Sequence, residues 1–294
     1  MLKLERILSP LDFSEFSSKA YDYAQSLARR YHATLLVEHV VQPVFSAHPS
    51  YVYPDMVNDI YQDMRTHAAQ QLEQFVKSHT PDGEQVECHV RDGAVTEAIL
   101  ALAESAKVDL IVMGTHGRHG FDRLMLGSVT EKVLRKARCP VLVVRRPAHD
   151  FVAPADRAEP VRLHRLLFCT DFSPHSERAL EHALSLAEEY QAELTLLHVI
   201  EEIPVSSDLT TTTAEVVRQL EASIPAEGRG RATIRPRMRV GRPYQEIVRF
   251  AQETETDLIV LGVRGRGALD LALFGSTTHR VIQQAPCPVL AVHI

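Results

Sequence analysis

Short apolar runs alternate along the chain with longer amphipathic stretches. Residues 110–113 and 141–144 are apolar at every position, which is typical of strands buried on both faces of a parallel sheet. Residues 15–31 instead place apolar side chains at positions 20, 23, 24, 27, 28 and 31, the spacing of one buried helical stripe. Because strands and helices follow one another, the pattern predicts an α/β fold with helices on both faces of the sheet.

The chain also repeats itself, and the repeat defines its organisation. Asp12 corresponds to Asp171 at an offset of 171 − 12 = 159, and Gly114 corresponds to Gly262 at an offset of 262 − 114 = 148. The second copy is therefore shorter by 159 − 148 = 11 residues, lost between His198 and Arg239. We expect two homologous domains.

Each copy is expected to hold the same order of elements. In the first, the predicted strands cover residues 4–9, 35–41, 85–91, 109–113 and 141–144, and the helices after Ser14 cover 15–31, 55–77, 96–106 and 128–136. In the second, the strands cover 164–169, 194–200, 233–240, 257–261 and 289–292, and the helices after Ser173 include a short one at 214–222, then 244–254 and 276–284. The sequence thus predicts two tandem, doubly wound, Rossmann-like domains, each a five-stranded parallel sheet. The domains are placed at 1–146 and 161–294, joined by a proline-containing, semi-rigid linker at 147–160.

Composition narrows the possible partners. The chain has 294 residues, of which 45% are apolar and 24% charged, a normal balance for a globular protein. Its formal net charge of −6 argues against a broad nucleic-acid surface, and it contains no apolar run long enough to span a bilayer. We expect a cytoplasmic protein that binds neither nucleic acid nor membrane. The four cysteines form no C-x-x-C pair and are expected to be reduced.

Candidate chemistry follows the fourth strand of each copy, where ligands bind in sheets of this kind. Both copies read G-x2-G-x9-G-S there, formed by Gly114, Gly117, Gly127 and Ser128 in the first and by Gly262, Gly265, Gly275 and Ser276 in the second. Glycines would let backbone N–H groups approach a polyphosphate, and the following helix would offer it a positive N-terminus. The alternative is that these are ordinary turn and cap residues, because Ser128 and Glu131 have the spacing of a capping box.

Two further residue types repeat beside the glycines. Arg118 and Arg266 occupy matching loop positions and suit phosphate recognition, although a solvated loop arginine is the alternative. Asp12 and Asp171 follow the first strand of each copy. They could accept hydrogen bonds from a ribose, hold a cation through water, or only form the turn into the helix.

With its DFS, HV, glycine-motif and CPVL segments in both halves, the chain resembles a tandem universal stress protein with ATP-binding glycine motifs, a family of adenine nucleotide α-hydrolase-like fold. The resemblance implies one adenine-nucleotide site per domain. In the first, the implied residues are Pro10, Asp12 and Val40 around the adenosine, Gly114, Gly117, Arg118, Gly127, Ser128 and Val129 around the phosphates, and Met113 as a further residue of the same site. In the second, they are Asp171, Val199, Leu261, Gly262, Gly265, Arg266, Gly275, Ser276 and Thr277. Cys169 replaces Pro10 in the second copy, so that pocket could differ in shape or be redox-sensitive.

Three functions stay open at this stage. The first is a regulatory stress-response protein that binds ATP, with or without Mg²⁺, and acts through unknown protein partners. The second is a slow Mg-dependent ATPase in which His116 accepts a proton. The third is a scaffold that needs no nucleotide. Because the fifth strands are apolar edges, we expect the two domains to pair through them as a pseudo-dimer, and a homodimer is a further option.

Overall fold

The computed structural model describes residues 3–42, 54–80, 84–115, 126–145, 150–152, 161–202, 208–225, 232–263 and 275–293. The first half contains β1 (Arg6–Pro10), α1 (Glu15–Tyr31), β2 (Thr34–Val41), α2 (Pro54–His79), β3 (Val86–Asp92), α3 (Val95–Ser105), β4 (Leu110–Gly114), α4 (Ser128–Lys136) and β5 (Val141–Val144). The second contains β6 (Arg165–Cys169), α5 (Pro174–Tyr190), β7 (Glu193–Ile200), α6 (Leu209–Ala222), β8 (Thr233–Val240), α7 (Pro243–Glu253), β9 (Leu258–Gly262), α8 (Ser276–Gln284) and β10 (Val289–Val292). The predicted order of elements is confirmed.

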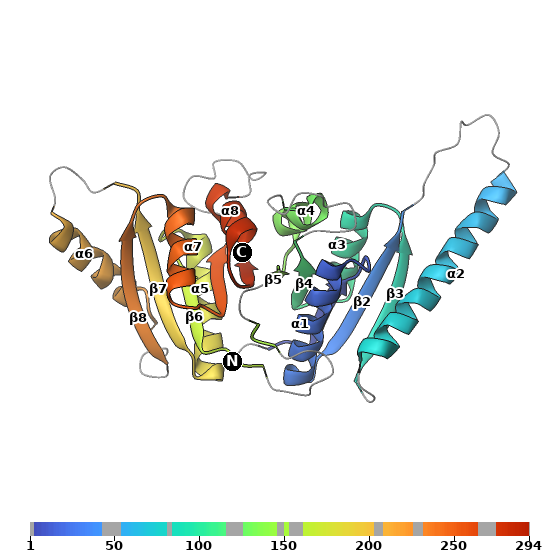
Figure 1. Cartoon of the computed structure of the whole chain (residues 1–294), viewed down its shortest axis with the longest axis horizontal. Coiled ribbons are helices and arrows are strands. Elements are labelled where there is room, and N and C mark those ends of the chain that lie inside the picture. Colours follow the sequence, from blue (N-terminus) through green and yellow to red (C-terminus); the bar gives the residue numbers. More distant parts are fainter. Residues whose placement is uncertain are drawn as a thin grey trace.

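All the described strands form one sheet, in the order β3-β2-β1-β4-β5-β10-β9-β6-β7-β8. Pairing is parallel within each half and antiparallel only between β5 and β10, where Leu142 lies opposite Leu290. The two halves therefore meet at the centre of Figure 1 through their fifth strands, as expected. Because β5 also pairs with β4 and β10 with β9, neither fifth strand is left as an edge for a second chain.

Alternating side chains of the strands build one core on each face of the sheet. Ile7 and Val112 belong to a core covered by α1, α2, α5 and α6, whereas Leu8 and Ile111 belong to a core covered by α3, α4, α7 and α8. Both cores run through the two halves. The α/β architecture with helices on both faces is thus confirmed, and no described helix is long and apolar enough to cross a membrane.

The joint between the halves is more firmly held than a semi-rigid linker suggests. Phe151 and Val152 are buried in the core beneath α1, and the Phe151 ring meets the Tyr23 ring edge-on, with centroids 4.7 Å apart. The hydroxyl of Tyr23 donates to Asp150 at 2.6 Å, and Lys19 pairs with the same carboxylate at 2.9 Å. This part of the predicted linker therefore packs against the first half.

The length difference between the copies lies mainly in one pair of helices. α2 has 26 residues, whereas its counterpart α6 has 14 and begins at Leu209, five positions before the predicted 214. Both helices lie at the outer ends of the sheet in Figure 1, far from the junction of the halves. The insertion therefore leaves the carboxyl ends of β1 and β4 unaltered.

Candidate functional site

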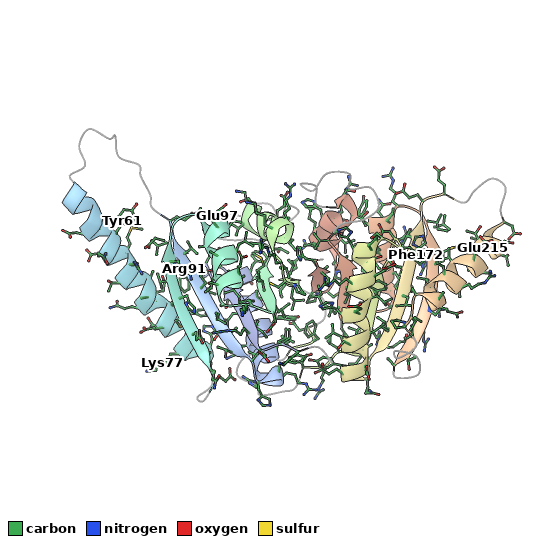
Figure 2. The ribbon with its side chains drawn as sticks, turned by 180° about the vertical axis from the view of Figure 1, so that it is seen from behind. Tyr61, Lys77, Arg91, Glu97, Phe172 and Glu215 are labelled. Atoms are coloured by element: carbon green, nitrogen blue, oxygen red, sulfur yellow. The ribbon has the colours of Figure 1, made fainter. Side chains whose placement is uncertain are left out.

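The turn after the first strand is built in the same unusual way in both halves. Phe13 has a φ of 62° and Phe172 a φ of 59°, in the left-handed region that bulky residues rarely adopt. Each ring lies against a histidine of the neighbouring strand, Phe13 at 4.7 Å from His39 and Phe172 at 4.6 Å from His198 between centroids. Strained backbone of this kind concentrates at functional sites, and here it is duplicated (Phe172 is labelled in Figure 2).

The aspartates before these phenylalanines form the turn with one carboxylate oxygen. Asp12 Oδ1 accepts hydrogen bonds from the Ser14 backbone N–H at 3.0 Å and the Ser14 hydroxyl at 2.6 Å. Asp171 Oδ1 accepts from the Ser173 N–H at 3.1 Å. Ser14 and Ser173 in turn cap α1 and α5, as predicted. The turn role of Asp12 and Asp171 is therefore observed, and a role toward a ligand stays a prediction.

The histidines of the two HV segments each form a hydrogen bond that stabilises the turn after the first strand. His39 donates from Nδ1 to the Leu11 carbonyl at 2.7 Å, and His198 does the same to the Thr170 carbonyl at 2.8 Å. Since a carbonyl can only accept, Nδ1 carries the proton in both rings. These bonds hold the strained turn against the carboxyl end of the neighbouring strand, β2 in the first half and β7 in the second.

The residues implied around the adenosine share one face of this edge. Pro10 and Met113 follow Leu8 and Ile111 by two positions on β1 and β4, and Val40 follows Leu36 by four positions on β2. All three therefore lie on the face covered by α3 and α4. In the second half, Cys169, Val199 and Leu261 belong to the same core face, under α7 and α8. The structure therefore brings these residues together on one face of the sheet, and their role toward an adenine base stays a prediction.

Gly114 and Gly262 have a packing role that sequence reasoning missed. A Cβ on Gly114 would lie 2.8 Å from the carbonyl carbon and oxygen of Phe16, and one on Gly262 would lie 2.9 Å from the carbonyl oxygen of His175. The first turns of α1 and α5 thus require glycine here, whatever ligand binds. The carbonyl of each glycine also accepts from a buried threonine hydroxyl, Thr130 at 2.8 Å and Thr278 at 3.1 Å. The repeat offset, 278 − 130 = 148, was the signal available in the sequence.

The ends of each glycine loop are hydrogen-bonded to each other. Gly127 N donates to the Thr115 carbonyl at 2.8 Å, and Gly275 N donates to the Val263 carbonyl at 3.3 Å. Between these ends, the predicted residues Gly117, Arg118, Gly265 and Arg266, together with His116, lie outside the described residues. Each loop therefore leaves and returns at the carboxyl edge of the sheet, next to the turn that holds the aspartate.

The capping box predicted at Ser128 is wrong. Gly127 is the N-cap of α4 and Ser128 is its first helical residue, while Glu131 pairs with Arg135 at 3.1 Å. Gly275 is likewise the N-cap of α8. Because glycine has no side chain, neither N-cap supplies a side-chain acceptor, and the N–H groups of the first turn face the loop. Ser128 and Ser276 are exposed there, and Val129 and Thr277 are half-buried beside them.

Comparison with known proteins places the chain in a family. The model of the universal stress protein family matches residues 3–145 and again 162–293. The chain belongs to the universal stress protein family. A universal stress protein of Mycolicibacterium smegmatis is 28% identical over 97% of this chain and 96% of its own.

One solved universal stress protein that matches nearly the whole chain agrees with this assignment. A crystal structure from Archaeoglobus fulgidus has 26% identity and a TM-score of 0.66, and the match covers 98% of this chain and 96% of that one. Another solved member, a universal stress protein in complex with cAMP, is 24% identical over 49% of this chain and 98% of its own, with a TM-score of 0.36.

One charged residue of this universal stress protein was missed in the sequence. Glu38 lies on β2 beside Pro10 of β1 and is 1% exposed. Neither of its carboxylate oxygens accepts a hydrogen bond from a described residue, and Arg91 on β3, labelled in Figure 2, forms an ion pair with it, with Nε 3.5 Å from Oε1. Burial outweighs the attraction of Arg91 and raises the pKa of Glu38 to about 7. Leu197 occupies the equivalent position, 197 − 38 = 159, in the second half.

The cysteine that replaces Pro10 is poorly suited to redox chemistry. Cys169 is 8% exposed, and burial raises its thiol pKa far above the ordinary value. Since the thiolate is the reactive form, the structure argues against a redox-sensitive second pocket and leaves the difference in shape.

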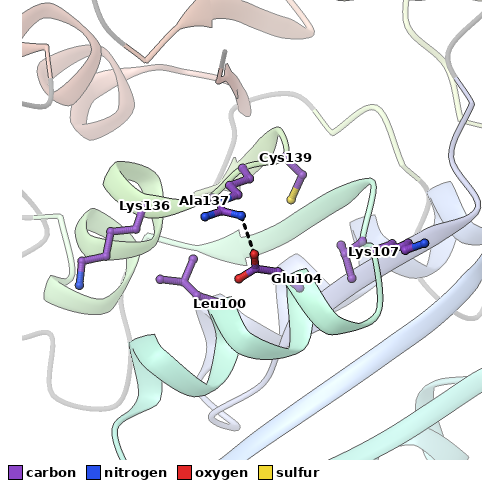
Figure 3. A pocket seen from close by; sticks show the side chains of 9 residues that line it. Leu100, Glu104, Lys107, Lys136, Ala137 and Cys139 are labelled. Carbon is purple, nitrogen blue, oxygen red and sulfur yellow. Dashed lines mark hydrogen bonds and ion pairs between the residues drawn. The ribbon is translucent and has the colours of Figure 1, made fainter. Parts of the chain in front are cut away.

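The hollow in Figure 3 is not the candidate site. It has a volume of about 250 Å³ and lies between the C-terminal ends of α3 and α4. Val108 and Cys139, which precede β4 and β5, line it, so it opens at the amino ends of these strands. The Arg138–Glu104 ion pair, at 2.5 Å, spans part of its rim. It therefore lies at the opposite edge of the sheet from the glycine loops.

Proposed function

We propose that this universal stress protein binds ATP at the carboxyl edge of each half and acts as a nucleotide-responsive regulatory protein. The observation that carries the proposal is a duplicated juxtaposition. In each half, an aspartate held in a left-handed Phe turn lies beside the closed ends of a glycine loop, and the loop leads into a helix whose N-cap is glycine. A packing role explains Gly114 and Gly262 but not the glycine N-caps.

Each part of the proposed site suits one part of the nucleotide. The base would pack against Pro10, Val40 and Met113, which share one face of the sheet. The ribose would approach Asp12, whose Oδ1 is already fixed by Ser14. The phosphates would lie at the N-terminus of α4, where N–H groups with no partner within the helix and the helix dipole favour an anion. This local arrangement lets a protein with a net charge of −6 bind an anion.

A substitution at the helix N-cap tests the phosphate position. Gly127 has φ −60° and ψ 140°, a conformation open to any L-residue, so leucine is accepted by the backbone there. We expect Gly127→Leu to abolish binding in the first half and Gly275→Leu, at φ −57° and ψ 127°, to abolish it in the second. Equilibrium dialysis would measure affinity, and native mass spectrometry would count nucleotides per chain.

The expected counts are two ATP for the original chain, one for each single variant and none for the double variant. Circular dichroism should show unchanged folding for all four proteins, and cAMP and GTP should be tested in parallel as competitors. Absence of ATP binding to the original chain below about millimolar concentration, an affinity of only about −4 kcal/mol, would refute the proposal. Unchanged affinity in Gly127→Leu would refute the placement of the phosphates.

A further inference from the structure

The residue that follows each fifth strand reaches across to the other half of the molecule. Arg145, directly after β5, donates from its guanidinium to the carbonyl of Gln283 in α8. His293, directly after β10, donates from Nε2 to the carbonyl of Leu134 in α4 at 2.7 Å. The two residues are equivalent in the repeat, since 293 − 145 = 148. The contact is therefore made twice, in opposite directions.

Both acceptors lie in the last turn of a helix whose first turn faces a glycine loop. The final carbonyls of a helix have no partner within it, and a cation or N–H donor at that end is favourable. α4 and α8 have nine residues each, so each is a rod of about 14 Å. Holding one end of so short a rod fixes the direction of its other end, where the N–H groups of Ser128 or Ser276 lie.

The C-terminal ends of β5 and β10 also form backbone hydrogen bonds to the glycine loops of their own halves. Thr115 N donates to the Val144 carbonyl at 3.2 Å, and Val263 N donates to the Val292 carbonyl at 3.0 Å. In each half, the last residue of the fifth strand thus binds the start of its own glycine loop, and the side chain of the following residue binds the helix of the opposite half. A side-chain substitution removes only the second of these contacts.

We propose that Arg145 and His293 are positioning residues for the nucleotide site of the opposite half. Arg145 aligns α8 and so serves the second site, and His293 aligns α4 and so serves the first. The inference rests on the proposed nucleotide function and extends it, because each site depends on a side chain from the other half. Neither residue touches the nucleotide.

The test uses full-length chains in which one site remains. Gly275→Leu leaves the first site, and there His293→Ala should weaken ATP binding roughly tenfold while Arg145→Ala changes it less than about twofold. Gly127→Leu leaves the second site, and there the order should reverse. Restoring a donor with His293→Gln or Arg145→Lys should recover most of the affinity. General destabilisation would weaken both sites alike and would not produce this crossed pattern.

Arg138→Ala is the matched control, because Arg138 lies near the end of α4 but pairs with Glu104 within the first half. It should leave both sites unchanged. If the original chain binds ATP but Arg145→Ala and His293→Ala each weaken their own half, or both halves equally, the inference is refuted and the proposed function stands. If the original chain does not bind ATP, both are refuted.

Discussion

Replacing Glu38 by leucine should stabilise the protein at neutral pH, and by an amount that grows with pH. Leucine is the residue that the second half carries at this position, where Leu197 is 1% exposed in the same core. Glu38 places a carboxyl group in that environment with no hydrogen bond from a described residue. The variant therefore makes the first half resemble a packing that the chain already contains.

The expected size follows from the pKa. Burial raises the pKa of Glu38 from 4.5 to about 7 in the folded protein. Below pH 4.5 the carboxyl is protonated in both the folded and the unfolded chain, so its ionisation costs nothing. As pH rises toward 7, only the unfolded chain ionises freely, and the free energy of unfolding falls. The full cost, reached above pH 7, is about 3 kcal/mol.

Urea unfolding followed by circular dichroism would measure this, since the chain has no tryptophan for fluorescence. The difference in unfolding free energy between Glu38→Leu and the original chain should grow by about 3 kcal/mol from pH about 4.5 to pH about 8. Glu38→Gln should show the same loss of pH dependence, with a smaller constant gain because it keeps a buried polar group. Glu97→Leu, at a side chain 62% exposed, is the control and should leave the pH dependence unchanged. Parallel curves for Glu38→Leu and the original chain would refute the reasoning.

Three further changes test the local geometry. Ser14→Ala should lower the free energy of unfolding by about 1 kcal/mol because it removes the cap of α1. Ser128→Ala should change it by less than about 0.5 kcal/mol because Ser128 is not a cap. Equal losses in the two variants would show that Ser128 is an N-cap after all. Gly114→Ala should cost about 1–3 kcal/mol in urea unfolding because its Cβ would press on the Phe16 carbonyl, and a neutral result would show that α1 can shift. The Cys169 thiol should resist alkylation at pH about 8 until urea is added, and rapid labelling of the folded protein would contradict its burial.

The repeat and the strands could be predicted from the sequence, because apolar strand patterns and amphipathic helix patterns recur in the same order in both halves. The runs 141–144 and 289–292 are apolar at every position and so do not fit an amphipathic helix. They predicted β5 and β10 at their observed bounds. The caps Ser14 and Ser173 were also correct, because each serine comes shortly after an apolar strand and directly before a helical stripe. Duplication gave each of these patterns a second, independent test.

What the sequence could not show depends on neighbours distant along the chain. The capping-box spacing of Ser128 and Glu131 cannot tell which residue starts the helix, and Gly127 became the N-cap because it bonds back to Thr115. Arg145 meets a residue 138 positions away only because β5 and β10 pair. In the sequence, Glu38 is only one polar position within a strand. Its burial becomes visible only when β1 and β3 are in place on either side of β2.

The junction of the halves shows what fusing two copies into one chain permits. Arg30 of α1 pairs with Glu189 of α5 at 3.7 Å, and its guanidinium lies 5.7 Å from the centre of the Tyr190 ring. Arg30 and Glu189 are equivalent in the repeat, since 189 − 30 = 159. In a symmetric dimer of two first halves, each residue at this contact would face its own copy, so Arg30 would face Arg30. Only the fused pair places opposite charges there, and this favours the pairing of a first half with a second half over the pairing of like halves.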